Sequence, residues 1–314
     1  MQSTGSGGEV PISACRQARQ ASGLEQGSLE RLADVARRAA EAGGVQLRAY
    51  FGRLQQVREK GRCGDLVTEA DLAAEQAVLA LLERETPEIG VLAEESGRRM
   101  RQGDLEWCVD PLDGTTNYAH GFPFFGTSVG LTWKGVPLLG ALAVPAFEEL
   151  YWAAPGLGSW CNGRRLAVSG CAAVADALLA TGFAYDRHQR LDNNYAEFAW
   201  FTHRSHGVRR AGAAAVDLAF VACGRLDGYW ERGLAPWDLA AGVVLLEEAG
   251  GLVSGYSGEP LSLAEGRVVA SGPALHPEIL KGLAACQPLQ GSSYGAPELD
   301  APAEQGPGDA TSAP

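Results

Sequence analysis

Three short acidic motifs constrain the fold of this chain more than any other feature. Each is predicted to lie where a strand ends or a helix begins. They are E-E-S at 94–96, D-P-L-D-G-T-T-N at 110–117 and P-W-D-L-A-A-G at 236–242. Taken singly, each has a structural explanation, as a solvated glutamate pair, an Asp-Gly turn and an acidic first helical turn. Taken together, they predict acidic side chains gathered at one place.

The spacing of these acidic residues allows their carboxylates to meet. Asp110 and Asp113 are separated by Pro111 and Leu112, so both can point to one place, and Glu94 can join them if its strand lies beside the strand that precedes Asp110. Crowded carboxylates repel one another unless a cation lies between them. An all-oxygen ligand set favours Mg²⁺ or Mn²⁺ over zinc or copper. The residues themselves therefore predict a carboxylate-bound divalent metal.

Composition and charge narrow the class of protein. Of the 314 residues, 46% are hydrophobic and 20% are charged, which is enough for one large core or two smaller ones. The formal net charge of -12 argues against a surface that neutralises phosphates of nucleic acid or membrane. We therefore expect neither nucleic acid nor membrane as a partner.

The cysteines indicate the compartment. There are 7 of them, scattered and without a C-x-x-C pair, so neither a disulfide framework nor a cysteine zinc site is favoured. The first 28 residues contain no apolar segment of signal-peptide length, and no run of apolar residues is long enough to span a bilayer. We expect a soluble, cytoplasmic protein.

Composition also divides the chain. Residues 1–28 are rich in Gly, Ser and Gln and are predicted to be a mobile tail, and residues 289–314 are predicted to be a disordered acidic tail. Between them we expect an α+β domain over 29–165 that carries the metal-binding motifs, and an α/β domain over 166–288 that completes the site. The boundary near residue 165 is soft by about ten residues.

Apolar periodicity predicts the main elements. Helices are expected at 29–40, 72–82, 194–203, 213–223 and 237–249. Strands are expected at 89–93, 105–109, 127–133, 138–144, 226–230, 252–254 and 268–271. Lys134-Gly135 and Asn162-Gly163 are predicted turns, and Pro111 is predicted to stop the strand that ends at Asp110.

With these motifs in this order, the chain resembles the inositol monophosphatase family of Mg²⁺-dependent, Li⁺-sensitive phosphatases. The segments D-L-V-T-E-A-D at 65–71 and G-S-W-C-N-G-R-R-L at 158–166 add to the match. The resemblance covers roughly residues 29–288 and leaves only the tails outside. It implies the layered αβαβα sandwich that this family shares with fructose-1,6-bisphosphatase.

The resemblance also implies roles for named residues. One metal would be bound by Glu94, Asp110 and the backbone carbonyl of Leu112, and a second by Asp110, Asp113 and Asp238, with two or three Mg²⁺ ions in all and Mn²⁺ as a possible substitute. Catalysis would involve Glu94, Asp71 and Thr115. Asp71 would accept a hydrogen bond from Thr115, and Thr115 would position the attacking water. The alternative for Asp71, a cap for the following helix, is compatible with this role.

Substrate contacts follow from the same resemblance. The residues implied are Asp113, Gly114, Thr115, Gly212, Ala213, Ala214, Glu231 and Asp238. Ala213 departs from the family pattern, which often has a hydroxyl residue there, and so removes one side-chain hydrogen bond. Lys60 matches a basic residue near the metals, although a surface role is the alternative.

The function implied is hydrolysis of a small polyol phosphate, with inositol 1-phosphate as the first candidate. Alternatives are histidinol phosphate, fructose 1,6-bisphosphate, NADP or a nucleoside 3′,5′-bisphosphate. A regulatory binding protein that keeps the fold is a rival from another class. Lithium inhibition and a homodimer are further implications of the resemblance.

Overall fold

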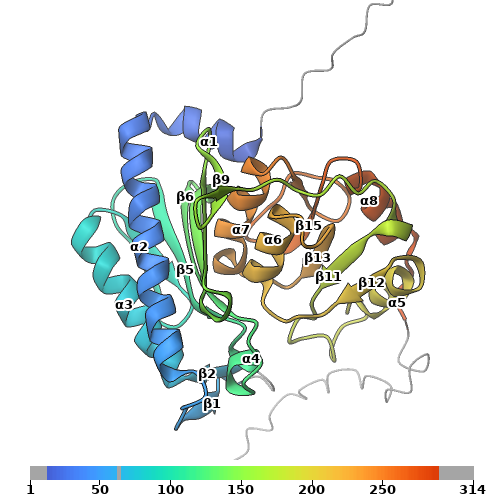
Figure 1. The fold of residues 1–314 in the computed structure, drawn as a ribbon, viewed down its shortest axis with the longest axis horizontal. Helices are drawn as coiled ribbons and strands as arrows, with labels where there is room; N and C mark the ends of the chain where they lie inside the picture. Colours follow the sequence, from blue (N-terminus) through green and yellow to red (C-terminus); the bar gives the residue numbers. More distant parts are fainter. Residues whose placement is uncertain (1–12, 62–64, 290–314) are drawn as a thin grey trace, which may run out of the picture.

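The computed structural model describes residues 13–61 and 65–289, and these residues form five stacked layers. Figure 1 shows the layers in order: α2 and α3, a large sheet, the helices α6 and α7, a smaller sheet, and α5 with α8. The αβαβα sandwich implied by the resemblance is therefore confirmed.

The large sheet has 8 strands in the order β10-β9-β8-β7-β6-β5-β3-β4. Only β3 and β5 pair in parallel, and every other pair is antiparallel. The strands are β3 (Gly90–Ala93), β4 (Gly97–Arg99), β5 (Leu105–Asp113), β6 (Gly126–Trp133), β7 (Val136–Val144), β8 (Glu149–Ala154), β9 (Gly158–Cys161) and β10 (Arg164–Arg165). The predicted turns at Lys134-Gly135 and Asn162-Gly163 are confirmed, with all four residues at positive φ.

The helices α2 (Gln26–Tyr50) and α3 (Glu69–Glu85) cover one face of this sheet. Leu29, Leu32 and Val35 of α2 are buried against Val129 and Leu131 of β6. A separate pair of short strands, β1 (Val57–Glu59) and β2 (Leu66–Thr68), lies beside the start of α3.

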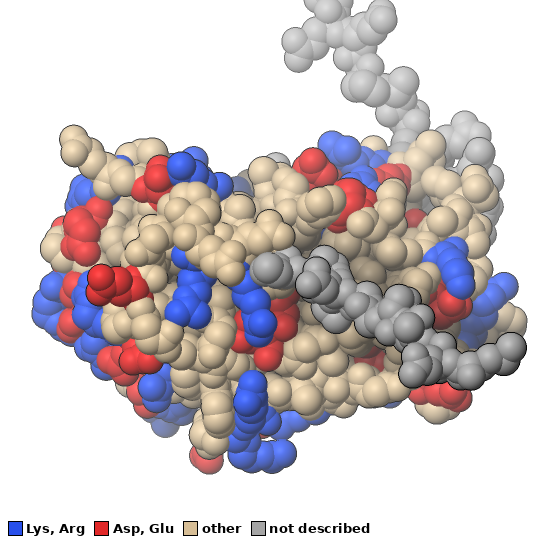
Figure 2. Space-filling view, turned by 90° about the horizontal axis from the view of Figure 1, so that it is seen from above, with Lys and Arg blue, Asp and Glu red and all other residues tan. Residues whose placement is uncertain are grey.

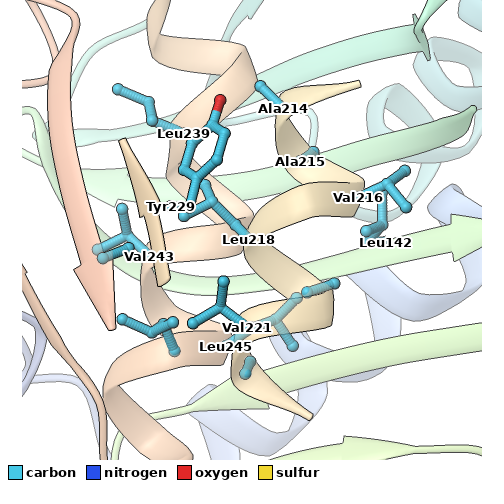
Figure 3. Close-up of a cluster of buried hydrophobic side chains, with 14 of the residues drawn as sticks. Leu142, Ala214, Ala215, Val216, Leu218, Val221, Tyr229, Leu239, Val243 and Leu245 are labelled. Carbon is cyan, nitrogen blue, oxygen red and sulfur yellow. The ribbon is translucent and has the colours of Figure 1, made fainter. Parts of the chain in front are cut away.

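The other face of the large sheet carries the middle helical layer. It contains α6 (Ala214–Ala222) and α7 (Pro236–Glu248), whereas α1 (Ala14–Ser22) lies across one end of the layers, at the top of Figure 1. Figure 3 shows part of this core, where Leu218 and Val221 of α6 lie near Val243 and Leu245 of α7, and Val216 of α6 lies beside Leu142 of the large sheet. Because these helices pack on both sheets, the two sheets share one apolar interior.

The second sheet has 5 strands in the order β12-β11-β13-β15-β14. Parallel pairs join β11 to β12 and β13, and antiparallel pairs join β15 to β13 and β14. The elements of this half are β11 (Leu178–Thr181), α5 (Tyr195–Arg204), β12 (Gly207–Arg209), β13 (Gly228–Arg232), β14 (Leu252–Ser254), β15 (Arg267–Ser271) and α8 (His276–Ala285). Phe201 of α5 and Ile279 of α8 cover its outer face.

The predicted N-terminal tail is wrong over its described part. Residues 14–22 form α1, where Cys15 and Ala18 are buried and the Arg16 Nε lies 2.9 Å from a Glu248 carboxylate oxygen. Two buried residues in a polar helix leave too short an apolar pattern for the sequence to reveal it. Residues 1–12 of this tail, and the acidic tail beyond residue 289, lie outside the described residues.

One predicted helix end differs from the structure. The helix predicted at 29–40 extends to Tyr50, because Gly43 and Gly44, which interrupt its apolar pattern, let it lie close to the sheet. The boundary near residue 165 falls at the end of β10, where the chain leaves the large sheet for the smaller one. Whether the two halves are separate domains stays a prediction.

Charge on the surface is mixed. On the face shown in Figure 2, Lys and Arg side chains lie interspersed with Asp and Glu. Across residues 13–61 and 65–289, no helix combines the length and apolar character needed to cross a membrane.

The packing of α7 on the sheet gives a test of the fold. A Cβ on Gly140 of β7 would lie 2.4 Å from the Ala241 Cα of α7, so Gly140→Ala should lower the free energy of unfolding by about 1–3 kcal/mol. Gly170→Ala is the matched control, because no atom lies within 4 Å of a Cβ there. Denaturant unfolding measures both, and equal stabilities of the two variants would contradict this packing.

Candidate active site

One cavity of about 410 Å³ opens where the two halves of the chain meet, and it brings the acidic motifs together. It is lined by all the residues predicted for the site except Asp71. These are Glu94, Asp110, Leu112, Asp113, Gly114, Thr115, Gly212, Ala213, Ala214, Glu231 and Asp238.

The strand register places Glu94 beside Asp110. β3 and β5 run parallel with Ala93 opposite Val109, and the Glu94 N–H donates to the Val109 carbonyl at 3.1 Å. The next residue on each strand is therefore an acid, and both face the pocket. The condition set by the sequence, that the Glu94 strand lie alongside the strand before Asp110, is met.

The strand β5 continues through Pro111, contrary to the prediction that this proline stops it. The pairing with β6 shifts between Asp110 and Asp113 and then resumes. Proline lacks the backbone N–H that a residue donates in a regular ladder. Where the pairing is irregular, no N–H is required of Pro111, so the strand can continue through it. The irregularity lies between the two aspartates, and the Leu112 N–H donates to Asp110 Oδ1 at 2.9 Å.

The Asp113 carboxylate lies at the N-terminus of α6. It accepts hydrogen bonds from the backbone N–H groups of Ala214, Ala215 and Val216, at 3.0, 2.8 and 3.2 Å. The residue at the cap position of α6, Ala213, has no side-chain oxygen to do this. Asp113 therefore supplies a helix cap from about a hundred residues away in sequence.

Asp238 is held at the start of α7. Pro236 opens the helix as predicted, and Asp238 Oδ2 accepts the Ala235 N–H at 2.7 Å. Asp113, at the end of β5, and Asp238, in the first turn of α7, therefore both line the pocket.

Thr115 and Asp71 form a hydrogen-bonded pair. Gly114, at φ +91°, turns the chain into the short helix α4 (Thr115–Ala119), and a Cβ there would lie 2.9 Å from the Phe124 carbonyl oxygen. The Thr115 hydroxyl lies 3.0 Å from Asp71 Oδ1 and 3.0 Å from the Leu112 carbonyl.

Asp71 also caps α3, so the two predicted roles coexist. Its Oδ2 accepts the Thr68 N–H at 2.8 Å and the Thr68 hydroxyl at 2.6 Å. With one oxygen on the cap and the other on Thr115, the carboxylate is fixed in orientation. Asp71 lies behind the pocket wall rather than in it.

Lys60 lies next to the acidic cluster. Its ammonium is 2.8 Å from Glu94 Oε1 and also contacts the Glu95 carboxylate. A purely exposed role is therefore excluded, since the ammonium pairs with a predicted metal ligand.

The remaining predicted substrate contacts line the same cavity, and the Ala214–Asp113 hydrogen bond places them next to the acidic cluster. Gly212, Ala213 and Ala214 line it through the turn that precedes α6, and Glu231 reaches it from β13. One detail differs from expectation. The Ala214 N–H is engaged by Asp113, so this backbone segment has one donor fewer for a ligand.

Burial and mutual repulsion raise the pKa values of the aspartates in the cavity. Burial, followed by the charges of Glu94, Asp113 and Asp238, raises the pKa of Asp110 well above its usual value. Burial raises the pKa of Asp113 to about 7 despite its three N–H donors, and burial with Glu94 and Asp113 raises the pKa of Asp238 to about 8. Such a cluster is stabilised by a cation.

The donor set fits a hard divalent cation. The four carboxylates predicted as metal ligands line the cavity together with Leu112, and oxygen donors of this kind are those that Mg²⁺ prefers. As the side chains stand in the described part of the chain, no three acidic, histidine or cysteine side chains are arranged to hold a metal ion. Asp113 and Asp238 point to backbone N–H groups, and Glu94 points to Lys60.

Sequence reasoning missed several residues of the cavity wall. Those outside the predicted set include Asp65, Tyr185, Arg187, Arg210 and Trp237. Arg187 and Tyr185 belong to the loop after β11, where no periodic pattern points to a pocket. Asp65 belongs to the D-L-V-T-E-A-D match, which was the available signal.

Comparison with known proteins agrees with this geometry. A model of the inositol monophosphatase family matches residues 28–287. An inositol-1-monophosphatase of Synechocystis sp. is 50% identical over 254 residues, which is 80% of this chain and 88% of that protein. A protein of Pseudomonas aeruginosa named Nus factor SuhB is 42% identical over 77% of this chain and 92% of its own length.

A solved structure gives the same result. The inositol monophosphatase of Anabaena (Nostoc) sp. superposes with a TM-score of 0.77 at 47% identity, covering 83% of this chain and 98% of that one.

The raised pKa values predict how the metal-free protein responds to pH. For Asp113 and Asp238 the value in the folded state lies above the usual 3.8, so the folded chain holds more protons than the unfolded chain between about pH 4 and pH 8. The free energy of unfolding should therefore fall as the pH rises through this window. Thermal unfolding in a chelator measures it, and saturating Mg²⁺ should reduce the fall.

Two variants control this prediction. Asp110→Asn removes the charge at the centre of the cluster and should make the metal-free profile flatter, whereas Asp176→Asn, on an exposed residue, should leave it unchanged. A metal-free protein whose stability rises steadily from about pH 5 to pH 8 would contradict the crowding of charge described above.

Proposed function

We propose that this chain, which belongs to the inositol monophosphatase family and is a phosphatase of phosphoric monoesters, hydrolyses a small polyol phosphate with Mg²⁺, inositol 1-phosphate first among them. The observation that carries the proposal is that one cavity is lined both by the four carboxylates of the acidic motifs and by Glu231, an acceptor suited to polyol hydroxyls. The inositol-1-monophosphatase name of the Synechocystis relative supports the choice of ester.

The metal ligands proposed are the residues that line the acidic side of the cavity. Glu94, Asp110 and the Leu112 carbonyl would hold one ion, and Asp110, Asp113 and Asp238 a second, with Mn²⁺ as a substitute and a third ion possible at the same cluster. Bound there, the ions supply charge stabilisation of the phosphoryl group and activation of water.

The chain's own residues would then orient the nucleophile. Thr115 donates its hydroxyl hydrogen to Asp71 Oδ1, and the lone pairs of its oxygen are left to accept a hydrogen bond from a water. Asp71 cannot rotate, because its other oxygen is held by Thr68. Glu94, across the cavity, accepts a second hydrogen of that water and fixes its direction.

The substrate would lie between the two sides of the cavity. Gly114 and Thr115, at the start of α4, face the phosphate, and Glu231 accepts hydrogen bonds from hydroxyls of the alcohol portion. The Gly212–Ala214 turn borders the same portion through its backbone. Ala213 offers no hydroxyl, so backbone groups and Glu231 carry the recognition there.

Other esters are the second candidate. Histidinol phosphate, fructose 1,6-bisphosphate, NADP and nucleoside 3′,5′-bisphosphates all carry hydroxyl or amine groups that Glu231 could accept. Arg187 and Arg210 line the cavity as well and would suit esters with a second anionic group. A regulatory binding role comes third, favoured by the Nus factor name of the Pseudomonas relative.

Three finer properties belong to the same proposal. Lithium inhibition would follow from occupation of a metal position by a small cation. A cytoplasmic location accords with the six described cysteines, none of which forms a disulfide. A homodimer is supported by the exposed rings of Phe122 and Phe147, 51% and 43% accessible, because exposed aromatic residues often mark interfaces.

The roles of Thr115 and Asp71 can be tested together. Thr115→Val removes the hydroxyl that orients the water and should lower kcat by about a hundredfold or more with little change in KM. Asp71→Asn keeps the shape but weakens the hydrogen bond to Thr115, and the double variant should lose no more than Thr115→Val alone. Steady-state kinetics with Mg²⁺ measures all three, and fully additive losses would contradict a shared role.

The substrate is tested by a panel of phosphate esters with Mg²⁺. We expect the highest kcat/KM for inositol 1-phosphate, and no hydrolysis when Asp110→Asn replaces the native protein. A hundredfold preference for another ester would overturn the lead substrate but leave the phosphatase in place. Hydrolysis that is unchanged in Asp110→Asn would indicate a contaminating enzyme and favour the regulatory role.

A further inference from the structure

The Glu231 carboxylate is held in a fixed direction by a tyrosine two residues before it. Tyr229 and Glu231 lie on one side of β13, and the Tyr229 hydroxyl donates to Glu231 Oε2 at 2.5 Å. The Tyr229 ring is fully buried. Figure 3 shows it among Leu218, Leu239 and Ala214, with its hydroxyl at the edge of the apolar cluster. The ring cannot move without disturbing this packing, so its hydroxyl is a fixed donor.

The same carboxylate lies close against Gly182, which has no side chain. In the parallel pairing of β11 with β13, Thr181 lies opposite Trp230, so the next residues, Gly182 and Glu231, are neighbours. A Cβ on Gly182 would lie 2.1–2.3 Å from the three carboxylate atoms of Glu231. Any side chain at position 182 would therefore push the carboxylate out of its place.

The backbone at Gly182 is itself fixed. The buried Asn194 side chain donates to the Gly182 carbonyl and to the Thr181 hydroxyl, each at 2.7 Å, and accepts the Trp230 indole N–H at 2.7 Å. These bonds tie the end of β11 to β13. The glycine cannot retreat to admit a side chain without breaking them.

The charges around Glu231 would otherwise displace it. The charged forms of Asp238 and Asp217 would repel it, and Asp217 is buried with Oδ1 lacking a partner among the described residues. Arg210 and Arg232 act in the opposite sense, but no ion pair within the described residues joins either of them to Glu231. Tyr229 is the one hydrogen-bond donor that the described residues direct at this carboxylate.

We propose that Tyr229 and Gly182 are positioning residues that fix the Glu231 carboxylate as an acceptor for substrate hydroxyls, and that they set the preference for polyol esters. This inference rests on the proposed function, because it assigns the polyol side of the cavity to Glu231. The residues assigned to the metals and the phosphate come from other elements, namely the ends of β3 and β5 and the starts of α4 and α7. Loss of either should therefore weaken use of esters that bring hydroxyls to Glu231 and spare esters that bring none.

The test compares two esters in the Mg²⁺-loaded protein. Inositol 1-phosphate presents ring hydroxyls, and p-nitrophenyl phosphate presents an aromatic ring without them. The readout is the ratio of their kcat/KM values. Tyr229→Phe and Gly182→Ala should each lower this ratio by roughly tenfold to a hundredfold, mainly through KM for the polyol ester, with p-nitrophenyl phosphate within about twofold of the native rate.

Two matched variants control for simple disruption. Tyr256→Phe removes another buried tyrosine hydroxyl, one that has no hydrogen-bond partner among the described residues. Gly170→Ala adds a methyl group where no atom lies within 4 Å of it. Both should keep the native ratio. A ratio that falls as far in these controls as in the test variants would overturn the inference.

A double-variant cycle separates positioning from a structural effect. If Tyr229 acts through Glu231, Tyr229→Phe should change the ratio in the native protein but not in the Glu231→Gln background. Equal changes in both backgrounds would overturn the inference, as would an equal loss on both esters. If the native protein itself shows no preference for the polyol ester, the proposed substrate class fails. A preference that survives both Tyr229→Phe and Gly182→Ala leaves that class standing and removes only the present inference.

Discussion

Repulsion between buried carboxylates is the constraint on which the rest of this structure depends. The fold brings four carboxylates from different elements to one cavity. Glu94 follows β3, Asp110 lies within β5, Asp113 ends β5, and Asp238 lies at the start of α7. Burial and proximity disfavour their charged forms, as the raised pKa values of the three aspartates show. The mutual repulsion of these carboxylates opposes folding, and perturbed acids gathered in one cavity are typical of a functional site.

The fold offsets part of this repulsion with backbone N–H groups. Three carboxylates accept hydrogen bonds at the N-terminus of a helix: Asp71 at α3, Asp113 at α6 and Asp238 at α7. The same carboxylates that face or support the site therefore also fix the starts of α6 and α7, between the sheets, and of α3, on the outer face of the large sheet. Site and core are coupled in this way, and side chains such as Asp113 belong to both. The contacts of Tyr229 and Gly182 likewise connect a carboxylate of the cavity, that of Glu231, to the packing of the smaller sheet.

The sequence alone allowed much of this to be predicted, and the failures have physical reasons. Helices and strands with clear periodicity, such as α7 and β6, were predicted to within a few residues. Pro111 was wrongly predicted to end its strand, because a local rule cannot foresee an irregular ladder. The cap that Asp113 provides to α6 joins residues far apart in sequence, and no local pattern reveals it. The helix α1 was missed because its buried face is only two residues long.

The most direct test of the account is a crystal structure of the protein grown with Mn²⁺ and inorganic phosphate, with the metal positions identified by anomalous scattering. Metal ions should lie within ligand distance of Glu94, Asp110, Asp113 and Asp238, with the phosphate beside Thr115. Ions bound at another cleft, or an Asp238 carboxylate turned away from ions held by the other three acids, would contradict it.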